Sequence, residues 1–240
     1  MPDLTPATLA AQIDHTILNP EASTDAVMAV ADEAVQHGFA SVCVAPAWVK
    51  AVADRVAGRT KVCSVVGFPH GTSKPTVKAI EATAAAKDGA REIDMVLHLP
   101  LLIESHVDRA TAEVREVVAG CRAVRSDIVV KVIVESAALH AADPTGDIIR
   151  HACDVVRTGG ADFIKTSTGF HPAGGASEQA VKLMVEHATG LHVKASGGIR
   201  TLADCRTYLD FGATRLGMSK GIAAIAELTG GASAQDDGTY

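Results

Sequence analysis

The sequence has few aromatic residues and no excess of positive charge. Of its 240 residues only 3% are aromatic, with one tryptophan and two tyrosines, and the formal net charge is −6. Nucleic-acid-binding domains usually present a basic surface, and proteins that bind single strands stack bases on aromatic side chains. Lysine and arginine are spread along the chain without the polybasic run that binds an anionic membrane. We therefore expect neither a nucleic-acid partner nor a membrane partner.

The sequence also lacks paired cysteines, metal-binding motifs and a long apolar run. Its five cysteines are an odd number and none are spaced as Cys-x-x-Cys, which argues against a disulfide framework or a zinc knuckle. The ten histidines form neither His-x-His nor His-Glu-x-x-His. No segment reaches the ~18 apolar residues of a membrane helix, and the N-terminus does not resemble a signal peptide. We expect a cytoplasmic protein without a metal or another cofactor.

Alanine, valine, isoleucine and leucine dominate the apolar residues, and they form eight strand-like segments separated by amphipathic helical patterns. The expected strands are Ile13–Leu18, Ala40–Ala45, Lys61–Gly67, Glu92–Leu97, Val129–Glu135, Asp162–Ser167, His192–Ser196 and Thr214–Met218. This alternation predicts an α/β fold, a single-domain (β/α)₈ TIM barrel over residues 1–229, with a short N-terminal helix and a mobile C-terminal tail over residues 230–240. An open doubly wound sheet is the alternative, although no segment looks like a charged edge strand.

Two lysines lie late in consecutive expected strands, Lys165 in Asp162–Ser167 and Lys194 in His192–Ser196. A buried cation is costly unless a partner or a reaction uses it. A second ammonium nearby disfavours protonation of the first, and a free lysine amine can condense with a carbonyl to form a Schiff base. The pair therefore favours a reactive amine at Lys165 with Lys194 as the cation that lowers its pKa. A purely structural ion pair is the alternative reading.

Other polar residues on the expected strands are candidates because active sites of such barrels lie at the C-terminal strand ends. Asp94 is expected to point into the barrel, since Ile93 and Met95 occupy the opposite face. It fits a proton-transfer role, a structural role beside a lysine, or both. Asp14 is expected either to contact the substrate or to form a structural hydrogen bond. Cys43 is interpreted first as a small buried residue that fills space in the core.

Two glycine-rich turns follow the last two expected strands, Ser196-Gly197-Gly198-Ile199 and Gly217-Met218-Ser219-Lys220-Gly221. In barrels of this kind, these turns commonly bind phosphate through backbone N–H groups. Either turn alone could be a tight turn and nothing more. Together, with Ser219, Lys220 and the nearby Gly169, they favour a phosphorylated substrate.

Eight segments resemble, in order, those of the deoxyribose-phosphate aldolases: IDHTIL, SVCVAP, VVGFPHG, EIDMV, KVIVE, FIKTSTGF, VKASGGIRT and GATRLGMSKG. The resemblance covers roughly residues 12–222. It implies a class I aldolase that reversibly cleaves 2-deoxy-D-ribose 5-phosphate into D-glyceraldehyde 3-phosphate and acetaldehyde in deoxyribonucleoside catabolism. By position, Lys165 matches the Schiff-base lysine, Lys194 the lysine that tunes it and Asp94 the proton relay. The matched substrate-binding positions are Asp14, Cys43, Gly169, Gly197, Gly198, Gly217 and Ser219.

The chain departs from some members of that family at Phe170, where they carry a lysine after the glycine of the KTSTG motif. Lys220 is the residue that we expect to supply the missing charge. Tyr240 matches a terminal tyrosine that helps proton transfer in some members, or it belongs to an unconstrained tail. A phosphosugar isomerase and a non-catalytic phosphate-binding barrel remain the alternative functions. The sequence leaves open whether copies of the chain form a homo-oligomer.

Overall fold

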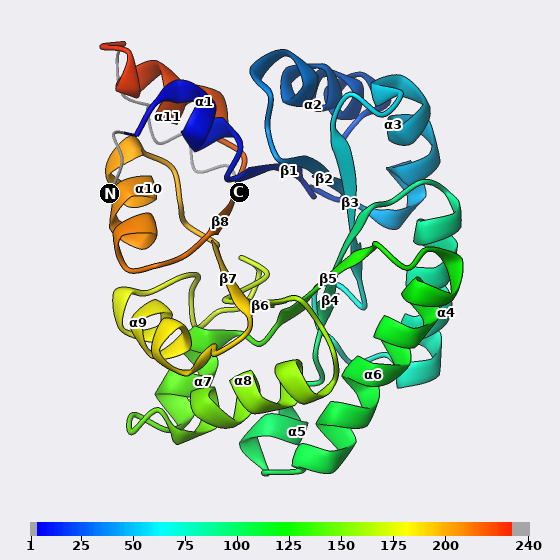
Figure 1. Cartoon of the computed structure of the whole chain (residues 1–240), viewed down its shortest axis with the longest axis vertical. Helices are drawn as coiled ribbons and strands as arrows, with labels where there is room; N and C mark the ends of the chain where they lie inside the picture. The colour runs from blue at the N-terminus through cyan, green and yellow to red at the C-terminus, as the bar shows by residue number, and fades with distance from the viewer. Residues whose placement is uncertain (1–3, 232–240) are drawn as a thin grey trace.

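The computed structural model describes residues 4–231, and eight parallel strands in it form a closed barrel. The strands follow chain order around the barrel, and β8 pairs with β1 to close it (Figure 1). Their bounds are β1 (Ile13–Ile17), β2 (Ser41–Val44), β3 (Lys61–Val66), β4 (Glu92–Val96), β5 (Val129–Ile133), β6 (Phe163–Lys165), β7 (His192–Ser196) and β8 (Arg215–Met218). All eight expected strands are present, and the closed sheet excludes the open doubly wound alternative.

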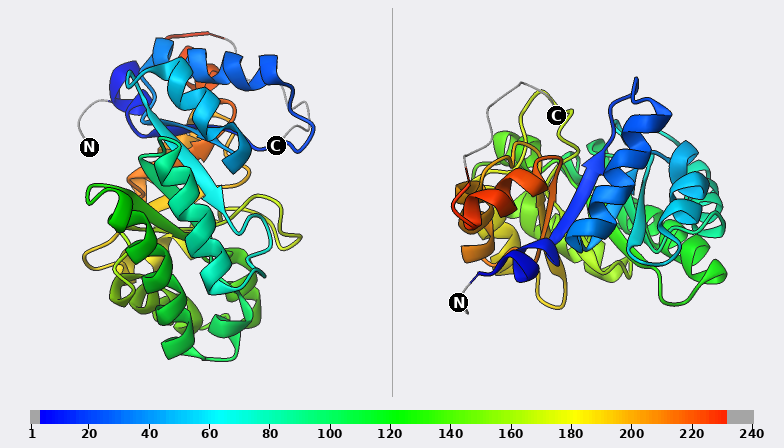
Figure 2. Two further views of the ribbon diagram at one scale, coloured as in Figure 1. Left: turned by 90° about the vertical axis from the view of Figure 1, so that its right-hand side faces the viewer. Right: turned by 90° about the horizontal axis from the view of Figure 1, so that it is seen from above.

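Helices surround the barrel, and α1 packs beside α11, so that the two ends of the described chain meet (Figure 2). The helices of residues 4–231 are α1 (Pro6–Ala10), α2 (Thr24–His37), α3 (Val49–Val56), α4 (Pro75–Lys87), α5 (Pro100–Ile103), α6 (Val107–Val124), α7 (Ser136–Ala142), α8 (Asp147–Thr158), α9 (Glu178–His187), α10 (Leu202–Asp210) and α11 (Gly221–Leu228), with a short 3₁₀ helix η1 (Pro46–Trp48). None of them combines the length and apolarity needed to cross a bilayer.

Local sequence explains where several helices begin. The Thr5 side chain caps α1, whose first residue is Pro6, and the Ser23 side chain caps α2 by accepting from Ala26 N–H. Gly38 ends α2 in the left-handed conformation (φ 68°), which glycine adopts without strain. The sequence did not predict α5 or α7, which are short helices inserted after β4 and β5.

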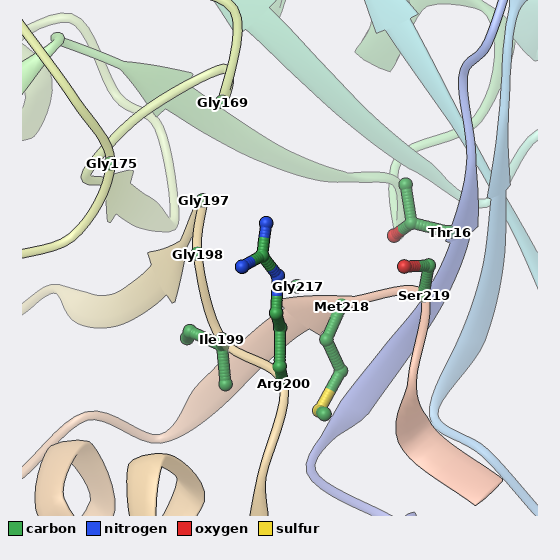
Figure 3. Close-up of a pocket in the computed structure, with 10 residues that line it drawn as sticks. All are labelled: Thr16, Gly169, Gly175, Gly197, Gly198, Ile199, Arg200, Gly217, Met218 and Ser219. Carbon is green, nitrogen blue, oxygen red and sulfur yellow. The ribbon is translucent and has the colours of Figure 1, made fainter. Parts of the chain in front are cut away.

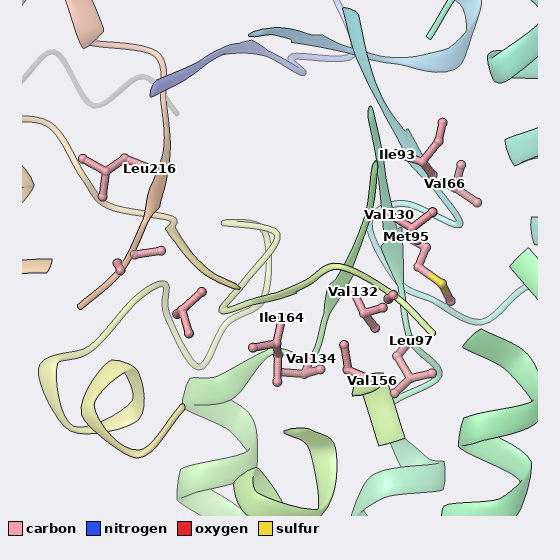
Figure 4. Packing of buried hydrophobic residues seen from close by; sticks show 14 of the residues in the cluster. Val66, Ile93, Met95, Leu97, Val130, Val132, Val134, Val156, Ile164 and Leu216 are labelled. Atoms are coloured by element: carbon pink, nitrogen blue, oxygen red, sulfur yellow. The ribbon is translucent and has the colours of Figure 1, made fainter. Parts of the chain in front are cut away.

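Most of the apolar core lies between the strands and the surrounding helices, as Figure 4 shows. Side chains alternate along each strand, so Ile93 and Met95 pack outwards and Asp94 points into the barrel. The expected orientation of Asp94 is therefore confirmed. Burying aliphatic side chains contributes about 25 cal/mol per Å² of apolar surface, and this outer layer leaves the barrel interior available for polar residues.

The expected domain extends to residue 229, and α11, the last described helix, ends at Leu228. Apart from residues 230 and 231, the expected tail lies outside the described residues, and so does Tyr240. Its proposed part in proton transfer therefore stays a prediction.

Candidate active site

Asp94 joins three lysines from three different strands inside the barrel. Its Oδ2 atom lies 2.8 Å from Lys165 Nζ and 2.7 Å from Lys194 Nζ, while its Oδ1 atom lies 2.8 Å from Lys131 Nζ. Cys63 adds a fourth contact by donating its thiol to Oδ1 at 3.2 Å. The strand register produces this arrangement, because Lys165 pairs directly with Lys194 and Asp94 with Lys131.

A second set of ion pairs lies beneath Asp94. Asp14 contacts Lys194 Nζ and Arg215 Nη1, both at 2.5 Å, and accepts a hydrogen bond from Ser41 Oγ at 2.7 Å. Glu92 contacts Lys131 Nζ at 2.5 Å and Arg215 Nη1 at 2.8 Å. We call Asp14, Glu92, Asp94, Lys131, Lys165, Lys194 and Arg215 the interior ion network.

The interior ion network sets the charge of its carboxylates. Burial alone would raise the pKa of Asp94, but Lys131, Lys165 and Lys194 hold it well below its ordinary value. Burial also opposes the ionisation of Asp14, whose pKa is likewise lowered by Lys131, Lys194 and Arg215. Both carboxylates are therefore anions at neutral pH.

Two lysines of the network are held as cations. Burial would lower the pKa of Lys194, but Asp14 and Asp94 raise it above its usual range. The pKa of Lys131 is raised in the same way by Asp14 and Asp94 against the effect of burial. Both side chains are inaccessible to solvent, so they supply fixed positive charge inside the barrel.

Lys165 differs from the other cations of the network in its contacts. Lys131, Lys194 and Arg215 each contact at least two carboxylates, whereas Asp94 is the only carboxylate of residues 4–231 that Lys165 contacts. The network as defined holds four basic groups and three carboxylates, and the exposed Lys61 also contacts Glu92 at 3.3 Å. Its side chain is 3% exposed, while those of Lys131 and Lys194 are fully buried. Lys165 is thus the amine best placed to meet a substrate.

The contacts of the two thiols beside the network, Cys43 and Cys63, indicate a structural role. Cys43 and Cys63 pair in register and belong to a small apolar cluster with Leu18 and Val65, while burial raises the pKa of Cys63 well above its ordinary value. Cys43, Cys63 and Asp94 lie close enough to ligate an ion together, as do Asp14, Cys63 and Glu92. The one carboxylate of the first trio and both carboxylates of the second are already paired with lysine ammonium groups, which makes each trio a poor match for a metal.

A cavity of about 340 Å³ opens beside the network at the C-terminal ends of β7 and β8. Figure 3 shows its lining residues, which are Thr16, Gly169, Gly175, Gly197, Gly198, Ile199, Arg200, Gly217, Met218 and Ser219. Gly169, Gly197 and Gly198 have φ angles of 85°, 85° and 82°, so their turns favour glycine. We call this cavity the glycine-lined pocket.

The glycine-lined pocket combines backbone with one cationic side chain. The guanidinium group of Arg200 points into the cavity, and the hydroxyl groups of Thr16 and Ser219 face it from the opposite side (Figure 3). A Cβ atom on Gly175 would lie 2.1 Å from Gly197 O, so close packing of two turns also requires glycine there. Exposed backbone in glycine turns, hydroxyl groups and a guanidinium suit an anion such as phosphate.

The structure brings most predicted site residues to this end of the barrel. Lys165, Lys194, Asp94 and Asp14 meet in the ion network, with Cys43 beside it, and Gly169, Gly197, Gly198, Gly217 and Ser219 line the pocket. Lys220 lines an adjoining hollow that shares Thr16 and Ser219, so Arg200 is the cation that lines the glycine-lined pocket itself. Phe170 is 40% exposed and meets Phe68 edge to face, with ring centres 5.2 Å apart.

Sequence reasoning gave no role to Glu92, Lys131, Arg215, Thr16 or Arg200. For Glu92, Thr16 and Lys131, the alternation of side chains along each strand could have predicted an inward orientation. Glu92 lies two residues before Asp94, Thr16 lies two after Asp14, and Lys131 stands between the outward-facing Val130 and Val132. Arg200 directly follows the first predicted glycine turn, Ser196-Gly197-Gly198-Ile199, but only the folded turn shows where its side chain points (Figure 3).

Comparison with known proteins agrees with this geometry. A sequence model for DeoC/LacD family aldolases matches residues 8–226. The chain is 47% identical over 223 residues to a deoxyribose-phosphate aldolase of Corynebacterium diphtheriae, covering 92% of this chain and 96% of that protein. It is 48% identical over 216 residues to a deoxyribose-phosphate aldolase of Mycobacterium avium, covering 90% and 94%.

A solved structure described as a tetrameric deoxyribose phosphate aldolase from Aeropyrum pernix superimposes with a TM-score of 0.82 at 32% identity, covering 94% of this chain and 92% of that chain. These relatives are named as aldolases, so the isomerase and the non-catalytic binding barrel are not favoured. The extent of the family match and the identity to these relatives lead to one assignment. The chain belongs to the DeoC/LacD family of aldolases.

Proposed function

We propose that this chain is a class I aldolase that reversibly cleaves 2-deoxy-D-ribose 5-phosphate into D-glyceraldehyde 3-phosphate and acetaldehyde, with Lys165 as the Schiff-base residue. One observation carries the proposal: Asp94 Oδ2 contacts both Lys165 Nζ and Lys194 Nζ inside the mouth of the barrel. This contact supports the proposal, because an amine, a second cation and a carboxylate that can accept a proton lie side by side.

The reaction begins when the free amine of Lys165 attacks C1 of the open-chain sugar and water leaves to give a protonated imine. Removal of the proton from the C3 hydroxyl lets C3 become the aldehyde carbon of D-glyceraldehyde 3-phosphate, which leaves as the C2–C3 bond breaks. The bonding electrons move into the imine to form an enamine. Protonation of C2 and hydrolysis release acetaldehyde and regenerate Lys165. The reverse sequence forms the carbon–carbon bond.

Asp94 and Lys194 support these proton transfers in different ways. Asp94 contacts the reacting nitrogen directly, so it can receive a proton from it or return one. Lys194 remains charged because Asp14 and Asp94 raise its pKa. Its positive charge lies beside the reacting nitrogen, since Lys194 Nζ and Lys165 Nζ contact the same oxygen of Asp94.

The glycine-lined pocket is the proposed phosphate subsite. Backbone at Gly197, Gly198 and Gly169 lines the cavity, and Arg200 directs its guanidinium group into it (Figure 3). Phosphate bound there would hold the C5 end of the sugar while C1 reaches Lys165. Phe170, an uncharged residue, follows Gly169 in the sequence, so we assign the phosphate-binding charge to Arg200, which lines this pocket, while Lys220 lines the adjoining hollow.

Imine trapping tests the proposal. Incubation with acetaldehyde and borohydride should add a reduced two-carbon group to Lys165, which peptide mass spectrometry locates. Lys165→Ala should lose both the adduct and the cleavage of 2-deoxyribose 5-phosphate. Lys50→Ala is a matched control, since Lys50 is exposed on α3 and pairs only with Asp54 among the described residues. Cleavage by the wild-type chain without a trappable lysine, or an adduct on another lysine, would contradict the mechanism.

We also infer that the chain assembles with copies of itself and works in the cytoplasm. Val77 and Ile80 on α4 are 49% and 69% exposed, and beside them lies a shallow hollow between α4 and α6. Exposed aliphatic side chains that adjoin one another mark interaction surfaces. The five cysteines are all buried free thiols, and burial raises the pKa values of Cys121, Cys153 and Cys205 to about 12, which suits a reducing compartment.

A further inference from the structure

Glu135 has a backbone conformation that its residue type does not favour. It lies one residue beyond Val134, which follows β5, and it immediately precedes α7, with φ 49° and ψ 58° in the left-handed region. Ala57 and Ser105 are the other described non-glycine residues with positive φ, and both lie on the surface. Glu135 is only 4% exposed. Glycine would adopt this conformation without strain, so the glutamate side chain must contribute something that the turn alone does not need.

The side chain of Glu135 reaches the segment that follows the Schiff-base lysine. Its Oε1 atom accepts a hydrogen bond from Thr168 N–H at 2.9 Å, in a buried position. The other oxygen, Oε2, is buried without a hydrogen-bond partner among residues 4–231. A buried carboxylate bonded through one oxygen to a backbone amide forms a strong, charge-assisted contact.

The neighbours of Glu135 explain why the backbone turns there. Val134 N–H donates to Lys165 O at 3.1 Å, and Ser136 N–H donates to Thr166 O at 2.8 Å. Three consecutive residues after β5 are thus bonded to the segment 165–168. The left-handed turn at Glu135 lets the chain leave the strand for α7 while the carboxylate stays aimed at Thr168.

The opposite side of this segment is attached to β7. Thr166 Oγ1 and Ser167 Oγ donate to Ser196 O at 3.0 and 2.7 Å, and Ser196 Oγ donates to Ser167 O at 2.6 Å. Those bonds hold the segment only as far as Ser167. Thr168, the next residue, is held from the β5 side by Glu135.

Thr168 connects Glu135 to the glycine-lined pocket. It immediately precedes Gly169, which lines that pocket, and its Oγ1 atom accepts from Phe170 N–H at 3.1 Å to close the turn. A shift of Thr168 would therefore move Gly169 relative to the turn at Gly197 and Gly198. Lys165, three residues earlier in the paired strand β6, would be less affected.

We propose that Glu135 is a positioning residue that fixes the Thr168–Gly169 turn and so sets the affinity of the glycine-lined pocket for the phosphate of the substrate. The proposal rests on the proposed aldolase function for its choice of substrate. It assigns Glu135 to phosphate binding and not to imine formation. Its effect should appear with phosphorylated substrates and be absent with unphosphorylated ones.

Two substitutions separate this role from a purely structural one. Glu135→Gly relieves the positive φ but removes the bond to Thr168, whereas Glu135→Gln keeps an acceptor oxygen at the same reach. Glu135→Gly is expected to raise KM for 2-deoxyribose 5-phosphate about tenfold, as expected for one lost charge-assisted hydrogen bond. Its kcat, its kinetics with 2-deoxyribose and its rate of imine trapping with acetaldehyde should stay within about twofold of wild type. Glu135→Gln should retain a KM within about threefold of wild type.

Other outcomes overturn the proposal. A wild-type KM in Glu135→Gly would show that the carboxylate positions nothing, and equal losses with both substrates would show a general effect on the fold. A Glu135→Gln variant that folds with a wild-type melting temperature but behaves like Glu135→Gly would show that the bond to Thr168 is not what matters. Titration with inorganic phosphate gives a readout independent of turnover. If the wild-type chain cleaves neither sugar, the aldolase function fails, while equal phosphate affinity in wild type and Glu135→Gly refutes the positioning role by itself.

Discussion

Replacing Asp94 with asparagine should disable the site and weaken the fold at the same time. Asparagine has nearly the shape of aspartate but no charge, and Asp94 is fully buried in contact with Lys131, Lys165 and Lys194. In the variant, the four basic groups of the interior ion network would face only two carboxylates, Asp14 and Glu92. Breaking a buried ion pair by removing one partner costs about 3–5 kcal/mol. We expect roughly 3 kcal/mol, since one lysine can lose its proton in response.

The loss of stability in Asp94→Asn depends on pH and should be smaller in acid. The pKa of Asp94 is lowered in the folded chain, because the three lysines outweigh the effect of burial. An aspartate in the unfolded chain has a pKa of about 4, so the stabilisation from this carboxylate is complete above about pH 4. It is lost as the pH falls from there towards the lower pKa that Asp94 has in the folded chain. The difference in unfolding free energy between wild type and Asp94→Asn should be largest at pH 7 and smaller by about 1 kcal/mol at pH 3.

Urea unfolding at pH 7 and pH 3, together with imine trapping, measures both effects. Trapping and cleavage should fall by about 10²–10⁴ in Asp94→Asn, the range for loss of a general acid or base. Glu113→Gln is the matched control: Glu113 is also buried, and its Oε1 lies 2.6 Å from Lys78 Nζ, but the pair is outside the barrel interior. That control should lose stability and keep its trapping rate. A stability difference below about 1 kcal/mol at pH 7, or equal trapping losses in both variants, would refute the reasoning.

Three further predictions concern the pocket and the surface. Arg200→Met should raise KM for 2-deoxyribose 5-phosphate about 10- to 100-fold, since a hydrogen bond to a charged group contributes about 1.5–3 kcal/mol. Its kinetics with 2-deoxyribose, which has no phosphate, should be unchanged. Equal changes with both sugars would count against Arg200 as the phosphate-binding cation. Phe170→Lys should lower KM for the phosphorylated sugar several-fold at low salt, with the gain disappearing near 1 M salt as charges are screened. Ile80→Lys should shift the chain to monomer in sedimentation velocity, and an unchanged sedimentation coefficient would exclude α4 from the interface.

The barrel could be predicted from the sequence because its signals are local. Apolar alternation, helix caps such as Ser23 and terminal glycines such as Gly38 depend on a few neighbouring residues. The helices α5 and α7 were missed because each is short. Pro100 is the first residue of α5, and a proline at this position is a helix-start signal that could have predicted the helix. In contrast, α7 begins after Glu135, and glutamate is not a residue type that suggests a positive φ.

The candidate site was only partly predictable because it depends on register between strands. Alternation places Asp94 and Lys165 inside the barrel, but it does not say at what height each side chain lies. The pairing of Asp94 with Lys131, and of Lys194 with Arg215, exists only once the strands are staggered around the closed sheet. For the same reason sequence reasoning chose Lys220 as the phosphate cation, whereas Arg200 is the residue directed into the pocket.

The interior ion network supports the proposal that Lys165, among several buried lysines, is the reactive amine. Each carboxylate added to a lysine stabilises its charged form, and each further contact makes loss of the proton more costly. Lys131 and Lys194 have several carboxylate contacts and no exposed surface, while Lys165 has one carboxylate contact within the described part of the chain and is 3% exposed. Adding a second carboxylate beside Lys165 should therefore suppress imine formation even though the lysine remains. We propose that the number of carboxylate neighbours, more than burial, distinguishes Lys165 from the structural cations of this site.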